Sequence, residues 1–161
     1  MTRRKLTHVD SRGAARMVDV SEKDRTVREA VAEAFVRASP GTLDLVREGR
    51  AEKGDVLAVA RIAGIAGAKR APDLIPLCHP VALTGVTIDL AVEGEGIRVT
   101  ATARAADRTG VEMEALTAAT ASALTIYDML KAAERGIEIT GVRLLSKSGG
   151  RSGTWKRSAG R

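Results

Sequence analysis

Two charged residues near the end of segment 110–131 have the types and the spacing for proton transfer. Asp128 and Lys131 are three residues apart, which places them side by side on the surface of a helix. A carboxylate and an ammonium group held in a cleft can act as base and acid with shifted pKa values. The same pair on an open surface is only a weak ion pair, worth about 0.3 kcal/mol. The residues alone leave both interpretations open.

One face of this segment carries small side chains between two charged ends. At about 100° per residue, Glu114 and Asp128 share that face with Thr117, Ala118, Ala121 and Thr125. The opposite face predicts a core contact, because it consists of Leu116, Ala119, Ala123, Ile126, Tyr127 and Leu130. Small side chains indicate the close approach of another backbone or of a ligand. Glu112 and Glu114 fit a binding site, and they fit equally a simple preference for the positive helix N-terminus.

The length of this helix keeps its charged ends apart. Glu114 and Asp128 are 14 residues apart, which at 1.5 Å per residue is about 21 Å. One pocket of a single chain cannot easily hold both. If both serve one site, two copies of the helix pair antiparallel across a two-fold axis, with the small-sided face as their contact. The alternative is that the same chain covers this face.

Other reactive residues lie outside this helix. Lys53 precedes a second predicted helix and adds another ammonium group. Several lysines together with carboxylates suit acid/base catalysis on an anionic substrate. The stretch 147–153 has glycines whose N–H groups can converge on phosphate, but taken alone it favours a flexible basic tail. Cys78 and His79 suggest a metal only weakly, since a closed zinc site needs about four ligands. We expect no metal, and His79 fits substrate binding or proton relay.

The composition predicts one domain with its own core. The chain has 161 residues, of which 44% are hydrophobic. We expect a compact core over about 17–153 and basic flexible tails at 1–12 and 154–161. A lone cysteine and the lack of an apolar stretch of about 20 residues favour the cytoplasm and argue against a membrane span.

The net charge of +6 invites a nucleic-acid interpretation, but it belongs to the ends. Residues 1–5 and 147–161 contain eight basic residues and no acidic one, which leaves 18 basic and 20 acidic residues between them. Basic termini are more often solvated tails, and aromatic residues for base stacking are scarce. We therefore expect no nucleic-acid partner.

The predicted elements have the order β, α, α, β, β, α, β. Residues 17–20 are predicted to form a strand and 26–38 a helix, because Thr26 and Glu29 match a capping box and apolar residues follow at helical spacing. The remaining predicted elements are a short helix over 42–49, a helix over 56–70, a rigid loop over 74–80, a hairpin over 86–104, the helix over 110–131 and a strand over 137–145 with a bulge at Gly141. This order favours α+β, with helices packed on a mainly antiparallel sheet.

Several long motifs occur together in this chain. They are Met-Val-Asp-Val-Ser (17–21), Lys-Gly-Asp-Val (53–56), Leu-Ile-Pro-Leu-Cys-His-Pro (74–80), Gly-Val-Glu-Met-Glu-Ala-Leu-Thr-Ala (110–118), Ile-Tyr-Asp-Met (126–129) and Leu-Leu-Ser-Lys-Ser-Gly-Gly (144–150). With this set the chain closely resembles the cyclic pyranopterin monophosphate synthase family of molybdenum cofactor biosynthesis, also called accessory protein C.

The resemblance implies a ferredoxin-like α+β fold, a homohexamer built as a trimer of dimers, and a lyase without a cofactor. The implied reaction converts 3′,8-cyclo-7,8-dihydroguanosine 5′-triphosphate to cyclic pyranopterin monophosphate and releases pyrophosphate. It makes Asp128 the main catalytic residue, with Lys131 as acid/base partner and Lys53 nearby. It implies a phosphate cluster of Lys53, Lys147, Arg28 and Lys69, contacts to the ring from Leu77, Cys78, His79, Met113 and Glu114, and substrate binding by Glu112. The competing class is a basic RNA-binding or interaction module on the same fold, since fold does not fix function.

Overall fold

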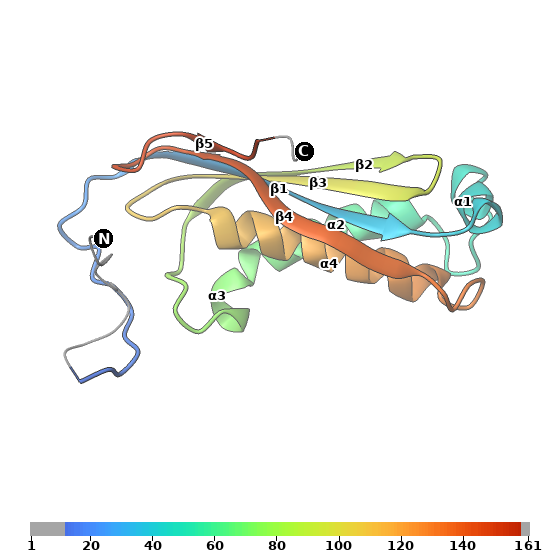
Figure 1. Ribbon diagram of the computed structural model, residues 1–161, viewed down its shortest axis with the longest axis horizontal. Coiled ribbons are helices and arrows are strands. Elements are labelled where there is room, and N and C mark those ends of the chain that lie inside the picture. The colour runs from blue at the N-terminus through green and yellow to red at the C-terminus, as the bar shows by residue number, and fades with distance from the viewer. Residues whose placement is uncertain (1–11, 159–161) are drawn as a thin grey trace.

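The structure is a computed structural model that describes residues 12–158. One antiparallel sheet has the strand order β2-β3-β1-β4-β5, and α2 and α4 lie together on one of its faces (Figure 1). The elements in chain order are β1 (Thr26–Arg37), α1 (Pro40–Arg47), α2 (Val56–Lys69), α3 (Ala71–Leu74), β2 (Leu83–Val92), β3 (Gly96–Asp107), α4 (Glu112–Leu130), β4 (Glu138–Ser148) and β5 (Trp155–Lys156).

Most of the predicted elements are confirmed. The α+β class is correct, and the order of the main elements is compatible with a ferredoxin-like β-α-β-β-α-β arrangement. The hairpin forms β2 and β3, and α2 begins where predicted, because the Asp55 carboxylate accepts a hydrogen bond from the backbone N–H of Ala58 at 2.9 Å. The register between β1 and β4 shifts opposite Gly141, which has a φ of 62°. The predicted bulge is therefore present.

Two predictions at the start of the domain are wrong. Residues 17–20 form no strand, and residues 26–37 form β1 instead of a helix. Thr26 of β1 pairs with Asp107 of β3, and Glu29 pairs with Ser148 of β4. As the central strand, β1 gains two hydrogen-bonded neighbours, which outweigh the local helical spacing. Its start consequently lies beside the ends of β3 and β4.

Alanine dominates the core between the sheet and the helices. On the inner face of β1, Ala30, Ala32 and Ala34 are fully buried. Alternate positions of β3 are likewise Ala101, Ala103 and Ala105. With so little side chain on the sheet, α4 lies directly over β1, β3 and β4.

The small-sided face of α4 is covered by the same chain. A Cβ atom on Gly67 of α2 would stand 2.7 Å from Cβ of Ala121 and 3.3 Å from the carbonyl oxygen of Thr117. A Cβ on Gly64 would overlap the hydroxyl of Ser122. The predicted contact between two copies of α4 along this face is therefore wrong, because α2 already occupies it. The close approach itself was predicted correctly.

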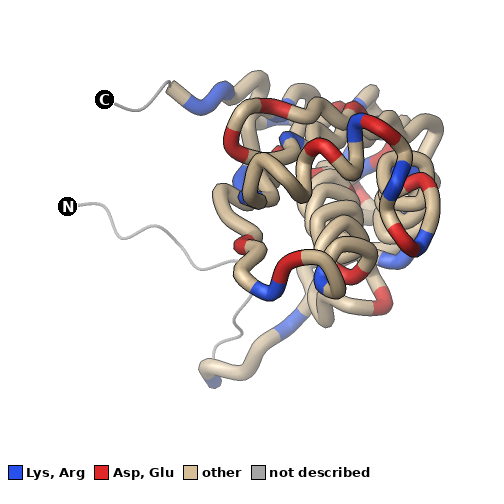
Figure 2. The backbone as a smooth tube through the Cα atoms, turned by 90° about the vertical axis from the view of Figure 1, so that its right-hand side faces the viewer, with Lys and Arg blue, Asp and Glu red and all other residues tan. Residues whose placement is uncertain are grey.

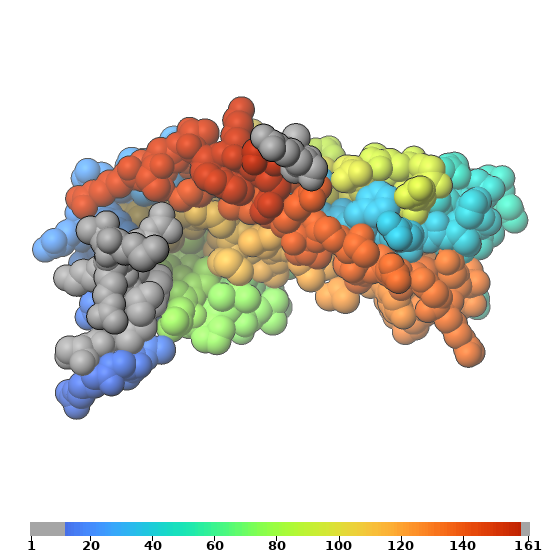
Figure 3. Space-filling view, in the orientation of Figure 1, coloured from blue at the N-terminus to red at the C-terminus, as the bar shows by residue number. Residues whose placement is uncertain are grey.

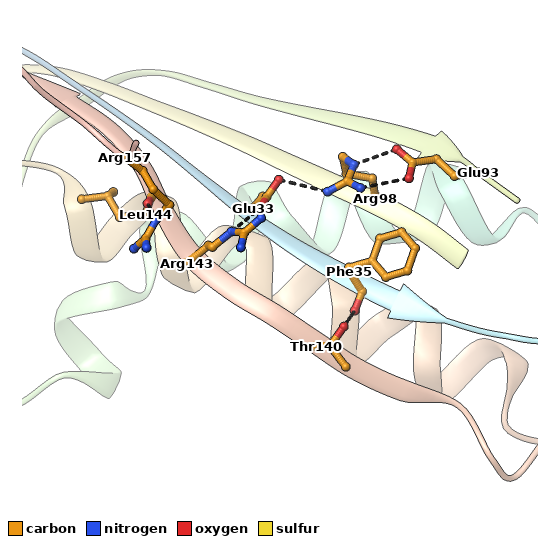
Figure 4. Close-up of polar contacts among 8 residues, drawn as sticks. All are labelled: Glu33, Phe35, Glu93, Arg98, Thr140, Arg143, Leu144 and Arg157. Carbon is orange, nitrogen blue, oxygen red and sulfur yellow. Dashed lines mark hydrogen bonds and ion pairs between the residues drawn. The ribbon is translucent and has the colours of Figure 1, made fainter. Parts of the chain in front are cut away.

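The sheet face opposite α2 and α4 is tied by charged side chains (Figure 4). Glu33 of β1 has only 9% of its side chain exposed, and it pairs with Arg98 of β3 at 3.1 Å and with Arg143 of β4. Arg98 also binds Glu93 at 2.7 Å and lies over the ring of Phe35. One nearly buried carboxylate thus links the central strand to both neighbours.

The start of the described chain lies at the same end of the molecule as the turn between β4 and β5 (Figure 3). Seen from the other end, acidic and basic residues are interspersed (Figure 2). Within the segment expected to be a C-terminal tail, Trp155 and Lys156 pair with β4. Residues 1–11 and 159–161 of the expected tails lie outside the described residues. None of the helices in residues 12–158 is long and apolar enough to cross a membrane.

Candidate active site

The predicted catalytic residues form one compact cluster at the C-terminal end of α4. Lys53, which lies just before α2, donates to the Asp128 carboxylate at 2.7 Å and to the Asp128 carbonyl oxygen at 3.0 Å. Lys131 binds the other carboxylate oxygen of Asp128 at 2.7 Å. These residues meet because α2 and α4 pack with the start of one near the end of the other. About half of each side chain remains exposed to an incoming substrate.

The charge state of this cluster is well defined. Hydrogen bonds from Lys131 and then Lys53 lower the pKa of Asp128 to about 2, and the bond with Asp128 raises the pKa of Lys131. Asp128 and Lys131 are therefore both charged at neutral pH. A carboxylate with so low a pKa is a weak proton acceptor while both lysines bind it. To act as a base, Asp128 must first lose at least one lysine to the substrate.

The second cluster lies at the other end of α4, where the predicted ring-binding residues meet. A cavity of about 420 Å³ is lined by Leu77, Cys78, His79 and Met113, among others. Pro76 and Pro80, on the two sides of residues 77–79, favour a rigid backbone there. The His79 Nε2 lies 2.7 Å from the carbonyl oxygen of Val18. Because a carbonyl only accepts, Nε2 carries the hydrogen, and Nδ1 of a neutral ring stays available as an acceptor.

Glu114 is the buried carboxyl group beneath this cavity. Only 1% of the residue is exposed, and one of its oxygens, Oε2, has no hydrogen-bond partner among the described residues. The Cys78 thiol donates to the other oxygen at a distance of 3.6 Å. Burial raises the pKa of Glu114, and burial together with the Glu114 charge raises the pKa of Cys78 to about 11. Glu114 can thus hold or release a proton nearer neutrality than a solvated carboxyl group.

A second, polar cavity of about 500 Å³ adjoins the first, and both share Lys23, Thr109, Gly110 and Glu112 in their walls. Three predicted substrate-binding residues, Arg28, Glu112 and Lys147, line it. Lys147 lies 3.3 Å from the Glu112 carboxylate and donates to the Ser152 hydroxyl at 2.8 Å. The glycine-containing stretch 148–152 forms one wall, so it belongs to a cavity and not to a free tail.

The structure brings together only part of the predicted phosphate cluster. Arg28 and Lys147 do line one cavity, but Lys53 lies with Asp128 at the opposite end of α4. Glu112 and Asp128 are 16 residues apart in this helix, which corresponds to about 24 Å, and Figure 1 shows α4 running along the sheet. Lys69 is exposed at the end of α2 and lines neither cavity.

Two cationic residues of the polar cavity escaped the sequence analysis, Lys23 and Arg108. Arg108 lies two residues before the motif at 110–118, and this position was the only signal available. Lys23 stands in a short polar stretch with nothing to distinguish it. Within residues 12–158, no three His, Cys, Asp or Glu side chains come together as metal ligands.

Comparison with known proteins gives consistent matches. The model of the MoaC family matches residues 17–150. A protein of Cereibacter sphaeroides is 60% identical over 96% of this chain and 98% of its own length. One of Streptomyces coelicolor is 57% identical over 96% and 91%, and one of Thermomicrobium roseum is 58% identical over 94% and 93%. All three relatives are named cyclic pyranopterin monophosphate synthase.

Proposed function

Because the chain belongs to the MoaC family, we propose that it is a lyase of molybdenum cofactor biosynthesis that forms cyclic pyranopterin monophosphate. The observation that carries this proposal is the 57–60% identity to three synthases over nearly the whole chain. The substrate is 3′,8-cyclo-7,8-dihydroguanosine 5′-triphosphate, and the second product is pyrophosphate. None of these relatives supports the alternative of an RNA-binding module. The single cysteine fits a cytoplasmic enzyme.

The two adjoining cavities suit the two parts of this substrate. The cavity beside Cys78, His79 and Met113 has the mixed apolar and polar lining that a heterocycle requires. The polar cavity beside Arg28 and Lys147 offers cations to the triphosphate. The shared wall at 109–112 lets one molecule extend through both.

The chemistry requires proton transfers in the ring and one displacement at phosphorus. In the displacement, a substrate hydroxyl oxygen bonds to the α-phosphorus, and the bond to the bridging oxygen breaks with its electron pair leaving on pyrophosphate. A base takes the hydroxyl proton. Asp128 serves as a base once the substrate has drawn Lys53 or Lys131 away, and the released ammonium group then acts as an acid.

A complete site on this proposal needs two chains. The Asp128 cluster and Glu114 lie at opposite ends of α4, about 21 Å apart along the helix. A second copy can bring its Asp128 to the cavities of the first. Since α2 covers the small-sided face of α4, the two copies meet through another surface. We extend the proposal to a homohexamer built as a trimer of dimers, whose mass in solution should be six times the 16.9 kDa of one chain.

The synthase activity has a direct test. Purified protein given the authentic cyclised precursor should release pyrophosphate and form the cyclic pterin, both measured over time. Asp128→Asn keeps the shape of the side chain and should lower turnover at least ~100-fold, as is typical of an acid/base group. Folded wild-type protein without turnover would reject the assignment.

The shared site has its own test. Glu114→Ala and Asp128→Asn proteins, each inactive and each folded by circular dichroism, are mixed under conditions that exchange subunits. A dimer that contains one chain of each kind has one unmutated site, so activity should return. Proven exchange without recovered activity would show that each chain builds its site alone.

A further inference from the structure

The polar cavity concentrates positive charge beyond the predicted residues. Its walls carry five cationic side chains, from Lys23, Arg28, Arg108, Lys147 and Arg151. Only two carboxylates, those of Asp24 and Glu112, face the same space. The lining therefore has a net charge of three positive charges at neutral pH. Such an excess within one cavity favours an anion of several charges.

Arg28 is held in place before any ligand arrives. Its Nε donates to the carbonyl oxygen of Asp107 at 3.2 Å, and its Nη2 donates to that of Arg108 at 3.3 Å. A Cβ atom on Gly150 would overlap the guanidinium group, so this glycine allows the loop to lie directly against Arg28. Gly150 has a φ of 70°, which also favours glycine. A cation fixed in this way binds an anion without a large loss of side-chain entropy.

Like Thr26, which also lines this cavity, Arg108 has a buried polar side-chain atom without a partner among the described residues. Its Nε is buried and has no hydrogen-bond partner among the described residues. A buried N–H group of a charged side chain is costly to leave unpaired. The backbone of Arg108 is fully used, since its N–H donates to Asp107 and its carbonyl oxygen accepts from Arg28. The side chain alone is therefore available to a ligand.

We propose that Arg108 binds the terminal diphosphate of the substrate, the part that leaves as pyrophosphate, together with Arg28 and Lys147. The planar guanidinium group matches two phosphate oxygens at once. The choice of a diphosphate rests on the proposed function, because the ring then fills the adjoining cavity and its phosphates extend into this one. The positive lining also stabilises the charge that develops on the leaving group.

The experiment uses inorganic pyrophosphate as the probe and the intact oligomer as the protein. Calorimetry should show binding to wild-type protein and at least 10-fold weaker binding to Arg108→Gln, with Arg108→Lys in between. The matched control is Arg104→Gln, on β3 four residues before Arg108, where the arginine pairs with Glu29 and lines neither cavity. The control should bind pyrophosphate like the wild type, and all variants should keep the wild-type circular dichroism spectrum.

The outcomes separate this inference from the proposed function. Equal pyrophosphate affinity in folded Arg108→Gln and wild-type proteins would overturn the inference, even if wild-type protein forms the cyclic pterin. Equal weakening by Arg104→Gln would also overturn it, because a general charge effect would then explain the result. A selective loss in Arg108→Gln supports the subsite, and it would still do so if the turnover assay rejected the synthase.

Discussion

Enlarging Gly64 should disturb the contact between α2 and α4 through one identified atom. A Cβ at this position would overlap the hydroxyl of Ser122 and stand 2.9 Å from the terminal methyl of Ile88. The Ser122 hydroxyl now donates to the carbonyl oxygen of Ala60 at 2.9 Å and is completely buried. In Gly64→Ala the hydroxyl must move and lose this bond.

The magnitude follows from three contributions to the free energy of unfolding. Overpacking lowers it by about 2 kcal/mol, and a buried hydroxyl without a partner lowers it by about 2 kcal/mol. Alanine in place of glycine inside a helix raises it by about 1 kcal/mol. Gly64→Ala should therefore be less stable than wild type by roughly 3 kcal/mol.

Removing the hydroxyl should reverse most of this loss. Ser122→Ala alone loses one hydrogen bond, about 1 kcal/mol. In the double variant the overlap disappears and only the flexible end of Ile88 must shift, so its total loss should be only about 1 kcal/mol. The two changes then couple by about 3 kcal/mol, far beyond the ~0.5 kcal/mol of independent sites.

Urea unfolding at one fixed protomer concentration measures these differences, since oligomerisation makes stability depend on concentration. Gly41→Ala in α1 is the matched control, because a Cβ there meets nothing within 4 Å. It should be neutral or slightly stabilising. Additive effects of Gly64→Ala and Ser122→Ala would refute the reasoning.

Three further predictions concern a cap, a thiol and a carboxylate. Asp55→Ala removes the N-cap bond to Ala58 and should lower the free energy of unfolding by about 1 kcal/mol; an unchanged urea midpoint would contradict this. Because the pKa of Cys78 is raised to about 11 by burial and by Glu114, iodoacetamide should react slowly at pH 8 and faster in Glu114→Gln, and equal rates would count against the thiol–carboxyl contact. The lysine partners that lower the pKa of Asp128 to about 2 should stabilise the fold above the usual carboxyl pKa of about 3.9. The difference in melting temperature between wild type and Asp128→Asn should thus shrink as the pH falls from about 4 towards 2. A difference that stays constant over this range would exclude stabilisation by the ionised Asp128 carboxylate.

The sequence predicted those elements whose local pattern agrees with their place in the fold. The hairpin of β2 and β3 alternates apolar and polar residues, and Asp55 marks the start of α2. The central strand β1 was missed because its apolar residues also recur at helical spacing. Its inner face is alanine, which does not favour strands, and its Glu33 depends on Arg98 and Arg143, which are 65 and 110 residues away.

In the candidate site, too, some residues could be predicted from local motifs and others could not. Motifs identified Asp128, Glu114 and Lys147, and the rise of a helix predicted that the first two lie far apart. The polar cavity was beyond local patterns, because its walls come from 23–28, 108–112 and 147–152. These segments meet only because β1 is a strand between β3 and β4. Arg108 could not be assigned until that pairing was known.

The alanine core makes the fold more sensitive to substitutions that enlarge a side chain than to substitutions that shorten one. Among the described residues, fourteen of the 25 buried apolar side chains are alanine. Truncating a large core residue costs about 2–5 kcal/mol, but fewer than half of these positions, eleven of 25, offer one to truncate. Every single-base change that replaces an alanine, apart from the change to glycine, enlarges the side chain, and enlargement in a packed core costs about 1–3 kcal/mol. In a library of random point mutations, most destabilising substitutions at buried positions should therefore be ones that enlarge a side chain.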